Sequence, residues 1–205
     1  NYAKNPFNHD VKEISKDNLH SWPVGLADNQ YQWIDLHSEG LSGILYEQGS
    51  GWYYSSNLGD GHFSNSVLVT PKPSYKGMND GNLSIQELEG NGVKYLVQSG
   101  RNGGYFELNP CDGWRSFNTF DQYPNLDFNN PNIKMIDVNG DGLPDLLISM
   151  ENEFLWYASK GRIGYDDYEV AMKSLLEENG PQVLFSDSNE RLIVTTMDMS
   201  GDGLA

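Results

Sequence analysis

The sequence is poor in cysteine, in basic residues and in long apolar runs. Cys111 is the single cysteine among 205 residues, so an internal disulfide and a cysteine-based zinc site are both excluded. No apolar run approaches the ~18 residues of a membrane-spanning helix, and we therefore expect no membrane insertion by this segment. The first ten residues, NYAKNPFNHD, have no signal-peptide character. Because the chain starts without Met and stops within a motif, we interpret it as a piece of a longer polypeptide.

Positive charge is scarce. The chain has 13 Lys and Arg against 29 Asp and Glu, which gives a net charge of −16. A nucleic-acid partner is not expected, because no basic face is present to replace phosphate counterions. The acidic excess has two interpretations: it keeps the protein in solution, or part of it gathers around bound cations.

Recognisable catalytic patterns are lacking as well. The four histidines show neither HExxH spacing nor an acidic companion at a fixed offset; they are His9, His20, His37 and His62. The stretch GRNGG at residues 100–104 lacks the lysine and the strand-to-helix context of a phosphate-binding loop. Pairs of acidic residues carry no weight in so acidic a chain. We therefore expect a protein that is not an enzyme.

What the sequence does have is a repeat, found by aligning the stretch IDVNGDGLPDLL with the rest of the chain. Related phrases open at Asp35 (DLHSEGLSGIL), Glu87 (ELEGNGVKYLV), Asp137 (DVNGDGLPDLL) and Asp198 (DMSGDGLA). A glycine holds the sixth position in every copy: Gly40, Gly92, Gly142 and Gly203. Aromatic runs follow the first three loops at similar distances, in WYY, YF and WY. Agreement at several landmarks indicates a true internal repeat.

Each unit is expected to contain four short strands. In the third unit, NIKMI precedes the acidic loop, DLLISM follows it, EFLWYAS comes next, and a fourth strand is expected near residues 164–170. Residues 166–179 could also hold a helical turn or two. Four antiparallel strands in about 50 residues are typical of a β-propeller blade, and a linear stack of sheets is the second interpretation. The fold class is thus all-β, with about three four-stranded blades and the start of another.

The repeat predicts the following segments: a lead-in at 1–30, blade 1 at 31–82, blade 2 at 83–132, blade 3 at 133–191, and the truncated start of blade 4 at 192–205. About three blades do not close a ring, because propellers have at least four. The segments are therefore expected to belong to a larger propeller.

The loop at residues 137–145 is a candidate calcium site. Calcium takes 6–8 oxygen ligands from carboxylates, amides, backbone carbonyls and water. Alternating positions of the loop offer such oxygens: the side chains of Asp137, Asn139, Asp141 and Asp145, and the Leu143 carbonyl. An EF-hand is excluded because its twelfth position would be Ile148, within a strand pattern. The metal would be structural Ca²⁺, since nothing marks an open position for a substrate; the alternative is a metal-free turn held by side-chain hydrogen bonds.

The other three copies differ in how many of these possible ligands they keep. The last copy keeps three side-chain ligands and a carbonyl, and is a second, truncated candidate metal site: Asp198, Ser200, Asp202 and Leu204. In the first two copies Gly43 and Tyr95 replace the closing carboxylate. These two loops are expected to be metal-free turns.

Three stretches resemble a known family. They are QWIDLHSEGLSGILYEQGSGWYYSSNLGDGHF, FDQYPNLDFNNPNIKMIDVNGDGLPDLLI and GPQVLFSDSNERLIVTTMDMSGDGLA. In order, they look like the B component of bacterial Tc-type insecticidal toxin complexes, a SpvB-like, Rhs-related family with FG-GAP/VCBS-type repeats. The acidic loops are also similar to those of the integrin α FG-GAP propeller, where such loops bind calcium. The resemblance implies a β-propeller fold and the calcium ligands named above.

The resemblance also implies partners and a location. The family's B component combines with a C component into a shell, and its propeller docks onto the pore-forming A component and gates toxin release. By resemblance, this chain scaffolds toxin assembly as part of a secreted, extracellular complex with A-type and C-type subunits. The alternative is a secreted adhesin or carbohydrate-binding propeller that uses Trp and Tyr at a blade rim. Trp52, Tyr53, Trp156 and Tyr157 could stack on sugars, but aromatics repeated at fixed blade positions usually belong to the core.

Overall fold

Nearly all regular structure in the described residues is β-strand. The computed structural model describes residues 13–14, 30–73, 83–100 and 102–174, with 178, 183–187, 189, 191 and 193–194. Within these residues every named element is a strand apart from the single 3₁₀ turn η2 (Gly161–Ile163). The described residues contain no helix of the length and hydropathy needed to cross a membrane. The expectation of an all-β chain is confirmed.

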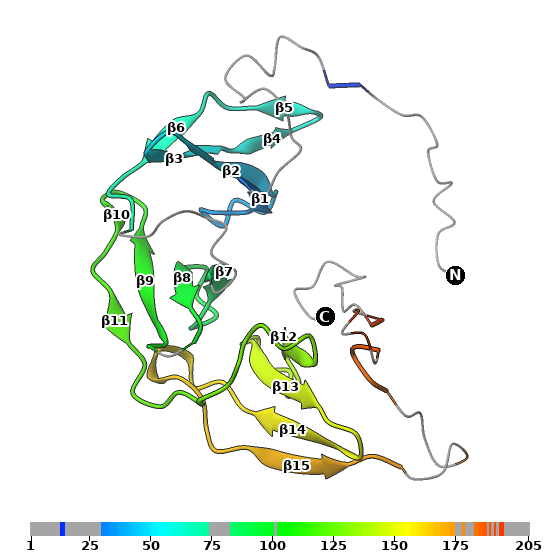
Figure 1. Cartoon of the computed structure of the whole chain (residues 1–205). Coiled ribbons are helices and arrows are strands. Elements are labelled where there is room, and N and C mark those ends of the chain that lie inside the picture. The colour runs from blue at the N-terminus through cyan, green and yellow to red at the C-terminus, as the bar shows by residue number, and fades with distance from the viewer. Residues whose placement is uncertain are drawn as a thin grey trace, which may run out of the picture. The chain divides into compact units, whose positions relative to one another are not determined.

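The first sheet contains the first acidic loop copy, which joins its first two strands. Its strands lie in the order β1 (Tyr31–Ile34), β2 (Gly43–Gln48), β3 (Gly51–Ser55) and β6 (Val67–Val69). A small hairpin of β4 (Asn57–Gly59) and β5 (His62–Phe63) lies between β3 and β6 in the sequence (Figure 1). Residues 43–46 at the start of β2 are buried on both faces of the sheet, which explains the continuous apolar run there.

The second sheet contains five strands. It is formed by β7 (Leu83–Glu87), β8 (Lys94–Gln98), β9 (Gly104–Asn109) and β10 (Gly113–Trp114), and β11 (Asn118–Thr119) also pairs with β9. Between β10 and β11 the ladder with β9 is interrupted: the Arg115 amide still donates to the Glu107 carbonyl, and residues 116–117 then bow away from the strand. Gly104 permits the return, because a Cβ there would lie 2.3 Å from the Asn118 carbonyl oxygen.

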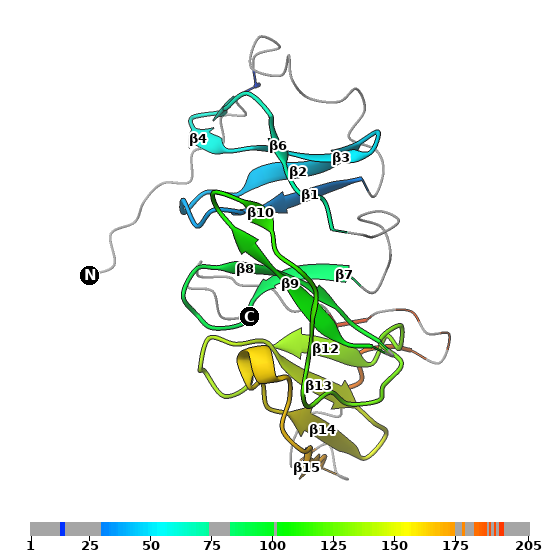
Figure 2. The ribbon, with the colours of Figure 1, turned by 90° about the vertical axis from the view of Figure 1, so that its left-hand side faces the viewer.

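The third sheet repeats the antiparallel pattern with β12 (Ile133–Ile136), β13 (Asp145–Ser149), β14 (Glu153–Tyr157) and β15 (Glu169–Met172). Figure 2 shows its four strands side by side. The expectation of a helical turn is wrong over residues 169–172, which pair with β14 as an exposed edge strand. All four of these residues are exposed, and their pairing with β14 overrides the helix-favouring composition there.

A turn of the third repeat packs tightly onto the second. The amides of Asp121 and Gln122 both donate to the Ile163 carbonyl, at 2.9 and 3.0 Å. Gly161 and Gly164 have φ of +61° and +121°. A Cβ on Gly161 would lie 2.2 Å from the Leu88 carbonyl oxygen, and a Cβ on Gly164 would lie 1.7 Å from the Gln122 carbonyl oxygen. Only glycine permits both the backbone conformation and this approach. The turn therefore joins the segments around the second and third sheets.

The buried core of the second repeat lies beside this joint. It is a cluster of mainly aromatic side chains: Leu88, Tyr95, Val97, Tyr105 and Phe120. The ring of Tyr165 lies against Phe120 at a centroid distance of 6.4 Å and brings the third repeat into the same aromatic group. Burial of large aromatic surfaces dominates the stability of such a core.

The sheets are separate, and no closed propeller ring is present in the described part of the chain. Compact packing divides the chain into two units, Asn1–Leu68 and Val69–Ala205, with the boundary inside β6. The predicted blade limits and the propeller ring stay predictions. The lead-in segment 1–30 and the start of blade 4 at 192–205 fall almost wholly outside the described residues.

Candidate functional site

An equivalent hydrogen bond forms within each of the three described acidic loops. Each loop joins the first two strands of its sheet, and its first residue is an acid whose carboxylate accepts the backbone N–H of the glycine five positions later. The pairs are Asp35 with Gly40 at 2.7 Å, Glu87 with Gly92 at 3.1 Å, and Asp137 with Gly142 at 2.8 Å. These glycines have φ of +89°, +82° and +83°, so the turn geometry itself repeats.

The loop at 137–145 is held by its own carboxylates. Asp137 Oδ1 accepts the amides of Gly140 and Asp141, at 2.7 and 3.1 Å. Asp141 Oδ1 accepts the Leu143 amide at 2.8 Å, and the amide side chain of Asn139 donates to Asp141 Oδ2 at 2.8 Å. These loop positions are exposed to solvent apart from Asp137 and Leu143, which are half-buried.

Asp145 differs from the other predicted ligands because it is fully buried, with 0 % of its surface exposed. Its Oδ2 accepts the Val138 amide at 3.1 Å and the indole N–H of Trp156 at 2.9 Å. Its Oδ1 accepts the Ser159 amide at 2.7 Å. A buried carboxylate is stable only with such donors. Asp145 thus ties the acidic loop to β14 and to the segment that follows it.

The donor set of this loop fits calcium by its chemistry, since all predicted ligands are oxygens. The side chains, however, are not arranged as a complete metal site. Across the described residues, no three His, Cys, Asp or Glu side chains converge as a metal site. Asp137, Asn139, Asp141 and the Leu143 carbonyl are the groups that would hold the ion, with Asp145 anchoring the loop from within. The bound ion would supply positive charge between the loop carboxylates.

The loop at 87–95 contains its own positive charge. The Lys94 ammonium pairs with Glu87 Oε1. Arg162, reaching over from η2, pairs its Nε with Glu89 Oε1 at 2.8 Å. Glu89 Oε2 accepts the Tyr95 hydroxyl at 2.8 Å. Burial, and then this hydrogen bond to Glu89, raise the pKa of the Tyr95 hydroxyl well above its usual value.

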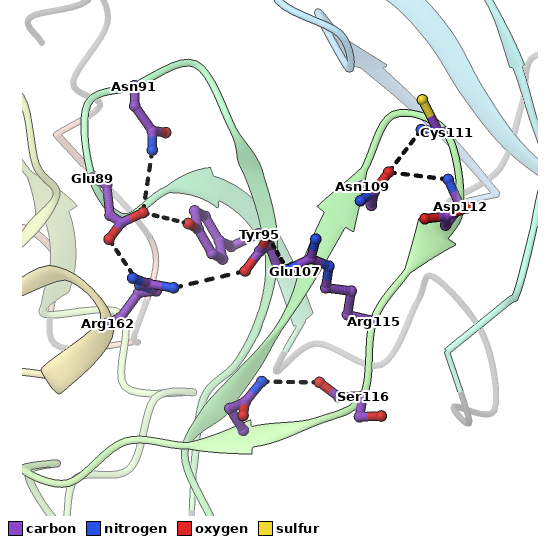
Figure 3. A network of polar contacts seen from close by, with 11 residues as sticks. Glu89, Asn91, Tyr95, Glu107, Asn109, Cys111, Asp112, Arg115, Ser116 and Arg162 are labelled. Atoms are coloured by element: carbon purple, nitrogen blue, oxygen red, sulfur yellow. Dashed lines mark hydrogen bonds and ion pairs between the residues drawn. The ribbon is translucent and has the colours of Figure 1, made fainter.

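The same arginine borders an open polar pocket of about 490 Å³. The pocket is lined by residues of β9, β11, η2 and the bowed segment after β10: Tyr105, Glu107, Arg115, Ser116, Asn118 and Arg162. Arg115 Nη1 lies 3.0 Å from Glu107 Oε1, and Arg162 Nη1 lies 3.7 Å from Glu107 Oε2. Figure 3 shows the two arginines approaching Glu107 from opposite sides.

The other residues considered in the sequence analysis do not come together in one site. Trp52 has 0 % of its surface exposed and belongs to the core, so it is no sugar-stacking surface. Trp156 is half-buried and donates to Asp145, while Tyr157 contacts Tyr168. The second candidate metal site, Asp198, Ser200, Asp202 and Leu204, lies outside the described residues, as do His9 and His20.

The contacts of Lys94 and Arg162 with the second loop were not predicted from the sequence. Lys94 could have been noticed, because it is a basic residue at the eighth position of an acidic loop, where the third copy has Pro144. Arg162 gave no such signal, since its partners lie 73 and 55 positions away, at Glu89 and Glu107. Only the packing of the glycine turn onto the second repeat brings it there.

Lys173 was also missed, and it is a buried cation without a carboxylate partner among the described residues. Its ammonium donates to Ser149 Oγ at 2.8 Å, to the Val183 carbonyl at 2.7 Å and to the Met150 carbonyl, and lies 4.3 Å from the Phe154 ring centre. Burial lowers the pKa of this lysine. Its contacts hold the end of the third sheet together and mark it as structural.

Comparison with solved structures finds similarity to Tc toxins. A chain of the Photorhabdus luminescens Tc holotoxin pore, carrying a point mutation in TccC3, matches 77 % of this chain at 26 % identity with a TM-score of 0.61. The match spans only 7 % of that much longer chain. The fold of this chain is therefore similar to a small portion of a Tc toxin component.

Two further structures match less well. An Agrocybe aegerita lectin that recognises non-reducing terminal N-acetylglucosamine matches 70 % of this chain and 38 % of its own, at 21 % identity and a TM-score of 0.45. A TcdB2–TccC3–Cdc42 structure matches 71 % of this chain and 12 % of its own, at 15 % identity and a TM-score of 0.27. No protein-family model matches the sequence, and no curated protein matches it.

Proposed function

We propose that this chain is a non-catalytic β-propeller segment of a Tc-type toxin B component, which scaffolds toxin assembly and docks to the pore-forming A component. The observation that carries the proposal is the similarity to the Tc holotoxin chain over 77 % of this sequence. Three successive antiparallel sheets, each with an acidic loop between its first two strands, support the blade interpretation. The expected setting is a secreted complex that also contains a C-type subunit.

The docking role is tested by association with a purified A-type pore-forming component. The 205-residue chain and its complete parent polypeptide are each immobilised and exposed to the A-type component. We expect the parent to retain it, because docking in this proposal resides in the propeller. Retention by the chain alone would place part of the docking surface within residues 1–205. Failure of the parent to bind would contradict the proposal.

We propose further that the loop at 137–145 binds a structural calcium ion. Asp137 and Asp141 supply negative charge there, and the described residues include no basic partner for either carboxylate. An ion between them would cancel repulsion and stabilise the folded chain by mass action, about 2.7 kcal/mol at a calcium concentration 100 times the dissociation constant.

The calcium proposal is tested by thermal unfolding with chelator and with added calcium. We expect calcium to raise the melting temperature of the unaltered chain and to leave Asp137→Ala unchanged. Glu87→Ala, the same change in the second loop, is the matched control and should still respond. Equal melting of the unaltered chain with chelator and with calcium would overturn the proposal.

A further inference from the structure

The polar pocket beside η2 has the chemistry of a ligand site that the scaffold role does not use. We propose that it binds a neutral polyhydroxyl ligand, a saccharide or a similar polyol. Its lining includes neither the loop at 137–145 nor any of Trp52, Tyr53, Trp156 and Tyr157. The inference stands independently of the proposed toxin role.

Charge balance favours a neutral ligand. The guanidinium groups of Arg115 and Arg162 are matched by the carboxylates of Glu107 and Glu89 in one connected network. An anion would add a charge beside Glu107, in a chain whose net charge is already −16. A cation would instead meet the two arginines. An uncharged polar molecule disturbs neither pairing.

The lining offers both hydrogen-bond donors and acceptors, and a hydroxyl group can use both. Arg115 and Arg162 keep side-chain exposures of 56 % and 46 %, so their guanidinium edges still face solvent. Glu107 keeps 20 % and can accept from a ligand hydroxyl. The side chains of Ser116 and Asn118 each supply a donor and an acceptor. A hydroxyl both donates and accepts, so a polyol can satisfy this mixed set.

The lining is held in place before any ligand arrives. Asn118 is fixed by strand pairing opposite Tyr105, and the Arg115 amide donates to the Glu107 carbonyl at 2.8 Å. Arg162 is placed by the glycine turn whose Ile163 carbonyl accepts two amides of the second repeat. A preformed site loses less conformational entropy on binding.

Apolar ligands fit this pocket poorly. Tyr105 is the single aromatic residue of the lining, and only 8 % of its surface is exposed, so no ring face is free for stacking. Binding must therefore rest on hydrogen bonds in a pocket that is open to solvent. Such a site is expected to hold a monosaccharide with a dissociation constant of roughly 1 mM.

The experiment compares three probes that share one ring and differ in charge: glucose, glucuronate and glucosamine. Each is titrated into the ¹⁵N-labelled 205-residue chain, and the amide shifts of Arg115 and Asn118 are followed. We expect glucose to bind most tightly. Arg115→Gln should weaken glucose binding about tenfold, because a charged hydrogen-bond donor is lost. Arg191→Gln removes the same charge from an exposed arginine outside the pocket and should have no effect.

Glu107→Gln provides the second variant. It leaves the shape of the side chain and makes the network one unit more positive, so the preference should move from glucose to glucuronate. Absence of shifts with glucose, tighter binding of glucuronate or glucosamine by the unaltered chain, or equal weakening by Arg191→Gln would each overturn the proposal. Amide spectra of the variants, recorded without sugar, distinguish a lost site from a lost fold.

Discussion

The loops at 87–95 and 137–145 have the same turn but balance their charge differently. In both, the first carboxylate accepts the N–H of the sixth-position glycine. In the second copy, Lys94 and Arg162 supply positive charge to Glu87 and Glu89. In the third copy, Asp137 and Asp141 accept only N–H groups of their own loop within the described chain.

The difference shows that the repeat can keep its turn while the residues that balance the charge of the loop change. At the eighth position Lys94 corresponds to Pro144, and at the ninth position Tyr95 corresponds to Asp145. The lysine provides an internal cation, and the proline provides no charge. Buried Tyr95 and buried Asp145 both anchor their loops through hydrogen bonds, but Tyr95 donates to the loop while Asp145 accepts from it.

The largest effect is expected from Asp145→Ala. Three N–H donors, from Val138, Trp156 and Ser159, would lose their acceptor in a buried site. A buried donor left unpaired costs ~1–3 kcal/mol, and the bonds from Val138 and Trp156 are only partly buried, so the free energy of unfolding should fall by roughly 3 kcal/mol. Urea denaturation followed by tryptophan fluorescence measures the change. Asp141→Ala, at an exposed position of the same loop, is the control; an equal loss there would show that burial of Asp145 is not decisive.

A second change transfers the internal cation to the third loop. Pro144→Lys places an ammonium where Lys94 stands in the second copy, and it should pair with Asp137. If calcium binds this loop, the stabilisation by calcium should then fall from about 2–3 kcal/mol towards zero at the same calcium concentration. Melting temperature with and without calcium measures the effect. Pro144→Gln, which adds length without charge, should keep the calcium response; a loss there as well would reject the charge argument.

Removing the internal cation from the second loop is the third test. Lys94→Met keeps the length of the side chain and leaves Glu87 without its partner. Lys94 has a side-chain exposure of 14 % and Glu87 of 31 %, so solvent screens the pair only in part. We expect a loss of about 1–2 kcal/mol in the free energy of unfolding, between the values for exposed and buried pairs. The double variant with Glu87→Gln should recover much of this loss, and additive losses would mean that the pair does not couple.

The repeat pattern was a good guide to local structure. Short apolar runs bounded by Gly, Asn and Asp predicted the strands, and the sixth-position glycine predicted a turn that recurs at Gly40, Gly92 and Gly142. These features depend on neighbouring residues, which is why sequence alone reveals them. The inward orientation of Asp145 was not predicted, since its donors Trp156 and Ser159 meet it only after β13 and β14 pair.

The polar pocket could not be predicted for a related reason. Its lining comes from β9, the segment through β11 and η2, and Arg162 reaches Glu107 only because Gly161 and Gly164 permit close backbone contact. Nothing in the local pattern around Arg162 marks it as a partner of the second repeat. The edge strand at residues 169–172 shows the same limit, because pairing with β14 decides its conformation.

The smallest effect concerns the ninth position of the second loop at alkaline pH. Tyr95→Phe removes the hydroxyl that donates to Glu89, and at neutral pH this should reduce the free energy of unfolding by about 1 kcal/mol.

Burial and Glu89 raise the pKa of Tyr95 in the folded chain above the usual 10.0. The unfolded chain therefore loses this proton first, and the stability that Tyr95 contributes is full below pH 10 and is lost as pH rises through the folded-state pKa. Each such proton contributes up to ~1.4 kcal/mol per pH unit, so the unaltered chain should lose stability more steeply above pH 10 than Tyr95→Phe. Urea denaturation at a series of pH values from neutral upward measures both slopes. The third loop has no tyrosine at this position, so equal slopes would place the alkaline sensitivity in other tyrosines and remove this difference between the two loops.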